Sequence, residues 1–401
     1  MVPPKNITLA KYKRRVGLAF QQGLSFIERV RHGIVEYARS HGSWSFAIMP
    51  EMLTPSVEWL RHARLDGALA LVVTPEDMKR VRALDFPVIN LAGHLKPSVI
   101  PSVMVNHRSI GEMAAEFFAC RGFRRIAYYG TSNMWYSQQR FEGFSGVAKR
   151  SGIQCQALMT GTLRTPSYRW RDQHRALLGW VRGLRPPVGI LASIDLRAAM
   201  VVDACQEAGL RVPDDVAVMG VDNDPAVCEL CTVPVTSVSR NDRRVGWEAA
   251  ALLDRLMNGE TPPGAPVFVA PERIVQRVST ETFAVDDAFV AGLLVEMRAR
   301  LDKPFGVEWL MEKTGRSRRW LELHFRKTLG KPPYAVINQL RVAKAQELLA
   351  GKARLSLTDV AAQCGFSDLR RFRIVFRQMT GMLPKTFRDG QRAAISLSNV
   401  R

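Results

Sequence analysis

The chain has 401 residues, too many for one ordinary domain, and carries 57 Lys and Arg against 37 Asp and Glu, a formal net charge of +20. Residues 296–401 hold 22 basic and 9 acidic residues, so +13 of the +20 is concentrated there. Such a basic block favours a polyanionic partner. No run of eighteen apolar residues occurs and the N-terminus lacks a secretory signal, which predicts a cytoplasmic protein with no membrane partner.

The six cysteines, at positions 120, 155, 205, 228, 231 and 364, lack the dense spacing of a disulfide scaffold, so reduced thiols are expected. Cys228 and Cys231 form a CxxC pair, which could indicate zinc or redox chemistry. No second pair or nearby histidine completes a four-ligand site. Packing is therefore the favoured interpretation, and neither a metal nor a cofactor is predicted.

Strand and helix patterns alternate along most of the chain. The clearest strand is the apolar run at 66–73, which is typical of a buried parallel strand. Further strands are predicted at 15–21, 44–49, 87–91, 125–130, 189–192 and 216–221, and helices at 27–40, 57–64, 113–120, 140–151, 198–208 and 246–257. This alternation predicts an α/β fold with doubly wound parallel sheets.

A two-helix pattern follows at residues 357–388. Gly365 permits a sharp left-handed turn after the first helix, and Ser367 or Asp368 can cap the second. Such a pair of helices predicts a helix-turn-helix.

The second helix of this pattern has two chemically different faces. Phe372 and Phe376 are four residues apart and should face the core. Arg370, Arg373 and Arg377 lie on another side, at spacings of three and four. A row of guanidinium groups on a short helix suits the major groove of DNA.

The same pattern occurs once upstream, at residues 307–333. The two copies match at an offset of fifty before the turn and fifty-one after it, which pairs Ser317 with Asp368 and favours Asp368 as the cap. Two copies predict two DNA-reading heads. Their candidate DNA contacts are Arg318, Arg319, Glu322, Arg326, Leu369, Arg370, Arg373 and Arg377. A helix at 334–350 should hold the heads at a fixed separation, and one at 286–296 should connect them to the preceding domain.

Residues from about 290 to 390 resemble the paired helix-turn-helix domain of AraC-type transcription regulators. The second copy carries most of the resemblance, in Ala361, Gly365-Phe366, Phe372, Phe376, Gly381, Pro384 and Phe387-Arg388, with Phe387 in place of the usual Tyr. In the first copy, Met311 replaces a usually small residue and Trp320 places a large aromatic early in the second helix. The resemblance implies double-stranded DNA as the partner.

Residues from about 14 to 280 resemble the effector domain of the lactose-repressor and galactose-repressor family. The matching phrases are Asp66-Gly67, Gly122 to Ile126, Arg140 to Phe144, Gly209 to Pro213, Val218 to Asp222 and Arg277 to Thr280. An effector domain of this kind ahead of an AraC-type domain is the arrangement of the xylose-operon regulator family, which the chain resembles over nearly its full length.

This resemblance implies a two-lobed, periplasmic-binding-protein-like effector domain at 1–282, a connecting segment at 283–300, a double helix-turn-helix domain at 301–392 and a tail at 393–401. It also implies a transcription regulator controlled by a monosaccharide, xylose or a related sugar, bound in the N-terminal cleft, with activation favoured over repression. A homodimer and contact with RNA polymerase are expected.

A sugar in a two-lobed fold should lie in the cleft, at the C-terminal ends of the strands. Carboxylates and guanidinium groups can make paired hydrogen bonds to its hydroxyls, and an aromatic face can cover the ring. The candidate contacts are Arg140, Asp195, Asp222, Asn223, Trp44 and Trp135, with Tyr136 as a further aromatic. Asp195 and Asp222 could instead cap local structure, Arg140 could form a salt bridge, and the aromatic residues could belong to the core.

Two other functions are alternatives to a sugar-controlled regulator. An enzyme is disfavoured because GxGxxG, GxxxxGK[ST], GxSxG and the Pro-Cys-His phrase of repair methyltransferases are absent from the sequence. The second is a DNA-binding regulator whose effector domain binds no ligand and serves for dimerisation. A panel of sugars would separate that case from a sensor.

Overall fold

The computed structural model describes residues 14–20, 23–41, 44–48, 57–97, 100–161, 169–282, 287–350 and 355–389. The chain divides into two compact units, Met1–Glu281 and Thr282–Arg401. The tail predicted at 393–401 and the start of the helix predicted at 286 lie outside the described residues. The finer boundaries predicted at 300 and 392 stay predictions.

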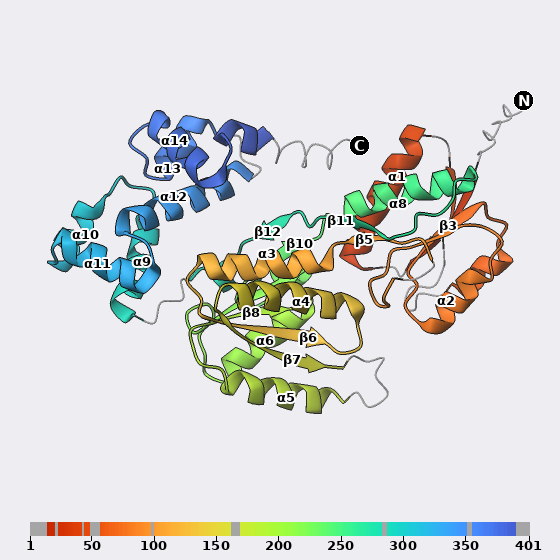
Figure 1. Ribbon diagram of the computed structural model, residues 1–401, viewed down its shortest axis with the longest axis horizontal. Coiled ribbons are helices and arrows are strands. Elements are labelled where there is room, and N and C mark those ends of the chain that lie inside the picture. Colours follow the sequence, from red (N-terminus) through yellow and green to blue (C-terminus); the bar gives the residue numbers. More distant parts are fainter. Residues whose placement is uncertain are drawn as a thin grey trace, which may run out of the picture. The chain divides into compact units, whose positions relative to one another are not determined.

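Lobe 1 of the first unit is built on a four-stranded parallel sheet of order β2-β1-β3-β4. Figure 1 labels β3 of this sheet. Its strands are β1 (Arg14–Ala19), β2 (Trp44–Ile48), β3 (Gly67–Ala70) and β4 (Val88–Asn90). Its helices are α1 (Ser25–His41), the short 3-10 helix Glu58–His62, α2 (Pro75–Arg82) and α8 (Asp242–Met257). The apolar side chains of β1 and β3 are fully buried, as expected of a sheet covered on both faces.

Lobe 2 is built on a six-stranded sheet of order β12-β10-β9-β8-β6-β7, in which β12 alone among the described strands runs antiparallel to its neighbour. The strands are β6 (Arg125–Thr131), β7 (Gln154–Thr160), β8 (Val188–Ala192), β9 (Val216–Val221), β10 (Thr236–Ser239) and β12 (Arg273–Val275). The helices are α3 (His107–Cys120), α4 (Trp135–Arg150), α5 (Trp170–Arg182), α6 (Asp195–Glu207), α7 (Pro225–Cys228) and the 3-10 helix Val278–Thr280.

The chain crosses between the lobes at three places: between β5 (Val103–Val105) and α3, between β10 and α8, and between β11 (Val267–Val269) and β12. Strands β5 and β11 pair with each other in parallel beside these crossings. The crossings bring segments that are distant in sequence to one boundary between the lobes. The first unit is therefore the doubly wound α/β fold that the alternation of strands and helices predicted.

Each lobe contains one helix pair that packs backbone against backbone. In lobe 1, a Cβ at Gly33 of α1 would lie 1.9 Å from the carbonyl oxygen of Arg243 in α8. In lobe 2, a Cβ at Gly143 of α4 would lie 2.1 Å from the carbonyl oxygen of Arg108 in α3. Side chains at either position would push the helices apart, so both pairs depend on glycine.

The second unit is entirely helical in its described part. Its helices are α9 (Ala288–Ala299), α10 (Val307–Thr314), α11 (Arg318–Leu329), α12 (Pro333–Ala350), α13 (Leu357–Gln363) and α14 (Leu369–Thr380), and residues 384–389 are also helical. One core joins α9, α10, α11 and the first half of α12, and a second joins the end of α12 to α13 and α14. Helix α12 therefore belongs to both heads, while α9 is part of the first.

Several predicted elements differ from the observed ones. The helix predicted at 57–64 is a 3-10 helix of five residues, and α3 begins at His107 and not at Met113 because Asn106 caps it. Helix α2, strand β7 and helix α5 were not predicted. Helix α2 is mostly charged, and β7 is an edge strand with mostly exposed side chains, so both have weak apolar periodicity.

Candidate functional site

A cavity of about 250 Å³ lies between the two lobes of the first unit. It is bordered by segments that follow the C-terminal ends of β3, β4, β8 and β9 and by the start of α1. This is where ligands bind in open parallel sheets. Its polar lining side chains include His94, His107, Tyr136, Arg140, Asp195, Asp222, Asp224 and Arg240.

The three charged residues predicted to bind a ligand come together in this cavity. Arg140 is fully buried on α4 and donates from Nη1 to the carbonyl oxygen of Ser193. Its Nη2 lies 3.9 Å from Oδ1 of Asp222, which follows β9. Burial lowers the pKa of Arg140, and the nearby Asp222 opposes that effect. Asp195 lies at the start of α6 and also lines the cavity.

Asp195 is held by its own protein neighbours. Its Oδ1 accepts from the Ser237 hydroxyl at 2.5 Å, and its Oδ2 accepts from the backbone N–H of Asp224 at 2.8 Å. A Cβ at Gly220 would lie 2.2 Å from Oδ1, so the glycine makes room for the carboxyl group. Burial, and after it the charge of Asp222, raises the pKa of Asp195 to about 7. A neutral carboxyl group there can donate a hydrogen bond as well as accept one.

Asp222 is the centre of a charged network that joins the lobes. Its Oδ1 accepts from Nη1 of Arg240 at 3.2 Å, and its carbonyl oxygen accepts from Nη2 of Arg29 on α1 at 2.6 Å. Arg29 and Arg240 both also contact Asp242, at 2.9 and 3.1 Å, at the start of α8. Asp222 has φ 110°, a strained value for a residue with a side chain. Such strain is common at binding sites.

His107 begins α3 at the first crossing between the lobes, and it is buried with 4% of its surface exposed. Burial, and then the charges of Arg140 and Arg240, lower its pKa well below the usual range, so the ring is neutral near pH 7. Its Nδ1 and the Nε of Arg140 are buried without a hydrogen-bond partner within the described part of the chain. Buried polar atoms normally have partners, so both are candidate ligand contacts.

The other predicted ligand residues lie elsewhere in the first unit. Trp44 is buried in the core of lobe 1, 5.8 Å from the Tyr37 ring between ring centroids. The amide oxygen of Asn223 accepts from Arg277 at 3.0 Å. Trp135 stacks on Phe268 near the crossing, at 6.4 Å. None of these three is among the described residues that line the cavity, whereas Tyr136 is.

Sequence reasoning missed His107, Arg240 and Phe26, which also line the cavity. The first two lie where the chain crosses between the lobes, and these crossings were not identified in the sequence. Phe26 lies in the first turn of α1, where the chain returns from β1. Parallel strands end at a common edge of the sheet, so a polar residue that follows a predicted strand is a candidate for the cavity lining. This pattern predicts Asp195 and Asp222 from the sequence.

In the second unit, the predicted turn geometry is confirmed. Gly315 and Gly365 have φ of 64° and 66°, and Gly330 and Gly381 end the second helix of each pair at 70° and 76°. Ser317 caps α11 by accepting from the backbone N–H of Trp320, and Asp368 caps α14 by accepting from that of Arg371. Both recognition helices thus begin and end in the same way, which confirms the offset of fifty-one between them.

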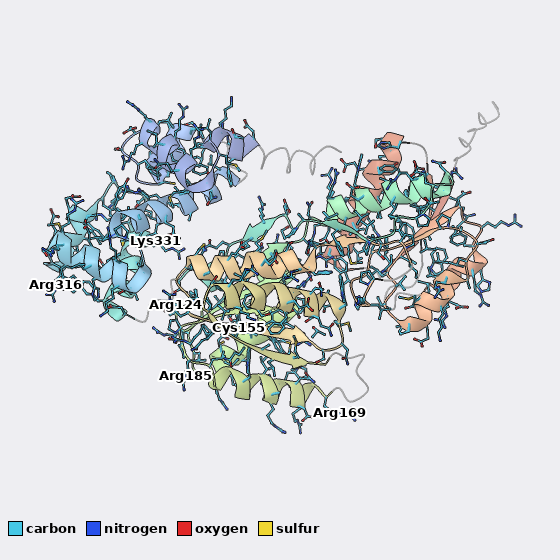
Figure 2. All side chains as sticks on the ribbon, viewed as in Figure 1. Arg124, Cys155, Arg169, Arg185, Arg316 and Lys331 are labelled. Atoms are coloured by element: carbon cyan, nitrogen blue, oxygen red, sulfur yellow. The ribbon has the colours of Figure 1, made fainter. Side chains whose placement is uncertain are left out.

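The predicted DNA contacts lie on the solvent faces of α11 and α14, except Leu369, which packs against the core formed by α12, α13 and α14. Arg318, Arg319, Arg326, Arg370, Arg373 and Arg377 are exposed, and Glu322 and Leu369 are half-buried. Glu322 accepts from Nε of Arg318 at 3.2 Å. Arg316 and Lys331, which flank α11, add positive side chains near its two ends (Figure 2). The buried side of α14 carries Phe372 and Phe376, as predicted.

Two family models match the chain, the periplasmic binding protein-like domain over residues 115–280 and the helix-turn-helix domain over residues 310–390. The xylose operon regulatory protein of Escherichia coli K12 is 27% identical over 388 residues, which is 94% of this chain and 97% of that protein. The solved structure of the xylose-binding transcription activator XylR is 25% identical, with a TM-score of 0.61, and covers 94% of this chain and 98% of that one.

A third relative shows the fold of the first unit alone. A periplasmic binding protein/LacI transcriptional regulator from Alkaliphilus metalliredigens is 18% identical, with a TM-score of 0.53, over 67% of this chain and 100% of that one. The fold and these matches define the class: the chain is a DNA-binding transcription regulator with a periplasmic-binding-protein-like domain followed by an AraC-type helix-turn-helix domain. Along nearly its full length it is a homologue of the xylose operon regulatory proteins.

The relatives that match along the chain are named as transcription regulators and not as enzymes. Among the described residues, no helix has both the length and the apolar character to cross a membrane. Cys228 is buried, and Cys231 is half-buried with its thiol donating to the carbonyl oxygen of Val227 at 3.2 Å. Burial raises the pKa of both thiols, which disfavours the thiolate needed for metal binding or redox chemistry.

Proposed function

We propose that the cavity of the first unit binds a monosaccharide and that binding changes how the second unit recognises DNA. The observation that carries this proposal is the convergence of Arg140, Asp195 and Asp222 in a cavity at the ends of parallel strands. The name of the solved relative, which describes a xylose-binding activator, supports a pentose as the first sugar to test.

The chemistry of the cavity suits a neutral, hydroxylated ligand. Oδ1 of Asp222 lies between Arg140 and Arg240, so donors and an acceptor are available side by side for neighbouring hydroxyls. Because Arg140 and Arg240 already share Asp222 as their negatively charged neighbour, an anionic ligand would disrupt the network. The neutral ring of His107 adds an Nδ1 that has no partner among the described residues. Phe26, whose ring lies under the Arg240 guanidinium at 4.8 Å, adds apolar surface to the lining.

The charged network joins the two lobes, so a ligand that binds to it can change how the lobes are held together. Arg29 and Asp242 belong to lobe 1, while Asp222 follows β9 of lobe 2, and Arg240 lies at the crossing between them. A ligand hydroxyl that donates a hydrogen bond to Asp222, or accepts one from Arg240, alters the same contacts that hold the lobes together. It can shift the balance between open and closed lobes to the extent that it binds one form more tightly.

The proposed output is activation of transcription by a homodimer in the cytoplasm. Each subunit would place α11 and α14 in successive major grooves, through the exposed residues of these two helices described above. RNA polymerase is the proposed further partner. One solved relative is named as a transcription activator, which supports activation over repression.

Isothermal titration calorimetry of the whole protein against a panel of pentoses and hexoses tests the proposal. At least one sugar should bind, and Arg140→Lys, which keeps the charge but loses the planar guanidinium, should weaken it. Arg169→Lys, an exposed residue of lobe 2 (Figure 2), is the matched control and should bind as the native protein does. Binding of no sugar would favour the alternative, an effector domain that serves for dimerisation without a ligand.

A further inference from the structure

Each recognition helix has one exposed apolar side chain at the centre of its solvent face. On α14 this is Ile374, which is 46% exposed. It lies four residues after Arg370 and three before Arg377, so these three side chains share one face. The opposite face carries the buried Phe372 and Phe376. Ile374 is therefore surrounded by positive charge and does not contribute to the core.

Helix α11 repeats this arrangement. Its exposed apolar residue is Leu323, which is 62% exposed and lies between Arg319 and Arg326 on the solvent face. The helix caps define the correspondence without reference to the side chains in question, because Leu323 and Ile374 are each the sixth residue after their caps, Ser317 and Asp368. The two residues are therefore equivalent in the two heads.

Single exposed apolar residues are common on protein surfaces and need no explanation by themselves. Two at equivalent positions, each at the centre of a cationic face, call for an explanation. If these faces enter the major groove, the arginines can hold phosphates or guanine edges and the central residue would face the base pairs. The apolar group that a major groove presents is the 5-methyl of thymine.

We propose that Leu323 and Ile374 each contact the methyl group of one thymine and thereby select T·A at one position in each half of the binding site. The half-sites differ beside that thymine. Arg373 of α14 corresponds to Glu322 of α11, and arginine pairs with guanine whereas a carboxylate accepts from the amino group of cytosine. The site is thus a direct repeat with a shared thymine and a different neighbouring base in each half.

The test uses the whole protein and its binding site, selected from random duplexes. Each thymine of that site is replaced in turn by deoxyuridine, which removes the methyl group and keeps the base-pairing pattern. One thymine per half-site should lose affinity by roughly fourfold, the effect of one buried methyl group. The two sensitive thymines in the site of each subunit should lie about 10–10.5 base pairs apart, the separation of adjacent major grooves on one side of the duplex.

Variants then assign each methyl group to a side chain. Ile374→Ala should bind the thymine and uracil forms equally at one half-site while keeping discrimination at the other, and Leu323→Ala should show the reverse pattern. Met379→Ala is the matched control, since Met379 is exposed on α14 but lies on another side of the helix. Thermal denaturation checks that the variants are folded. The proposal is overturned if no thymine is sensitive to methyl removal, or if discrimination is unchanged in both variants.

Discussion

Replacement of Asp195 by Asn should change how the stability of the first unit depends on pH. Asn can keep both local hydrogen bonds, because its oxygen can accept from the Asp224 N–H and its amide can donate to the Ser237 hydroxyl. The substitution therefore removes the charge and little else. Because the carboxyl group is buried, its ionisation in the folded protein lowers the free energy of unfolding.

Burial raises the pKa of Asp195 from the ordinary 3.8 to about 7 in the folded protein. A carboxyl group with a raised folded pKa holds its proton more tightly when folded, so its contribution to stability is full below about pH 4 and is lost as pH rises toward 7. Raising the pKa from 3.8 to about 7 corresponds to a change of about 4 kcal/mol in the free energy of unfolding, since a tenfold change in proton affinity is about 1.4 kcal/mol.

Urea denaturation of both proteins at several pH values between about 4 and 8 measures this difference. The free energy of unfolding of Asp195→Asn, relative to the native protein, should increase across this range by as much as about 4 kcal/mol. Asp85→Asn, at an exposed carboxylate of lobe 1, should show no such trend. If the free energies of unfolding of Asp195→Asn and of the native protein changed with pH in the same way, Asp195 would not be a buried, protonated group.

Other predictions concern packing and DNA binding. Gly143→Ala should destabilise lobe 2 by about 1–3 kcal/mol in urea denaturation, because its Cβ would meet the backbone of α3. A Cβ at Gly146 on the same helix would lie 3.5 Å from the nearest atom outside the helix backbone, Nη1 of Arg150, so Gly146→Ala should not be destabilising. Equal effects of the two substitutions would contradict the close helix pair. Arg370→Ala and Arg373→Ala should each reduce discrimination between binding sites by roughly 1–3 kcal/mol in competition assays, and a uniform loss for all sequences would make them phosphate contacts. DNA affinity should fall steeply with salt in titrations, and a flat response would contradict phosphate binding by the basic second unit.

The sequence predicted the second unit in more detail than the first because its signals are local. A glycine at a left-handed turn, a capping side chain and an apolar pair four residues apart each act within one or two helical turns. The equivalence of Ser317 and Asp368 could therefore be established from spacing alone, and the caps confirm it. Leu323 and Ile374 were missed because exposure is a property of the folded helix pair.

The cavity depends on contacts between distant segments, so the sequence predicted it in part. Asp195 and Asp222 follow apolar strands, and that local signal placed them at the edge of the sheet. Arg240 and His107 lie where the chain crosses between lobes, and Arg29 reaches Asp222 across 193 positions of sequence. Trp44 has the chemistry of a sugar-stacking residue, but β2 directs it into the core beside Tyr37.

The central claim is that a sugar in the cavity of the first unit controls DNA binding by the second. Fluorescence anisotropy with a labelled binding site, with and without the sugar identified by calorimetry, measures this directly in the native protein and in Asp222→Asn. Asn tolerates the positive φ of this position better than most residues and removes the charge between Arg140 and Arg240. We predict that the variant binds DNA normally without sugar and no longer responds to it. An undiminished response in the folded variant, or a loss of DNA binding without sugar, would contradict the account.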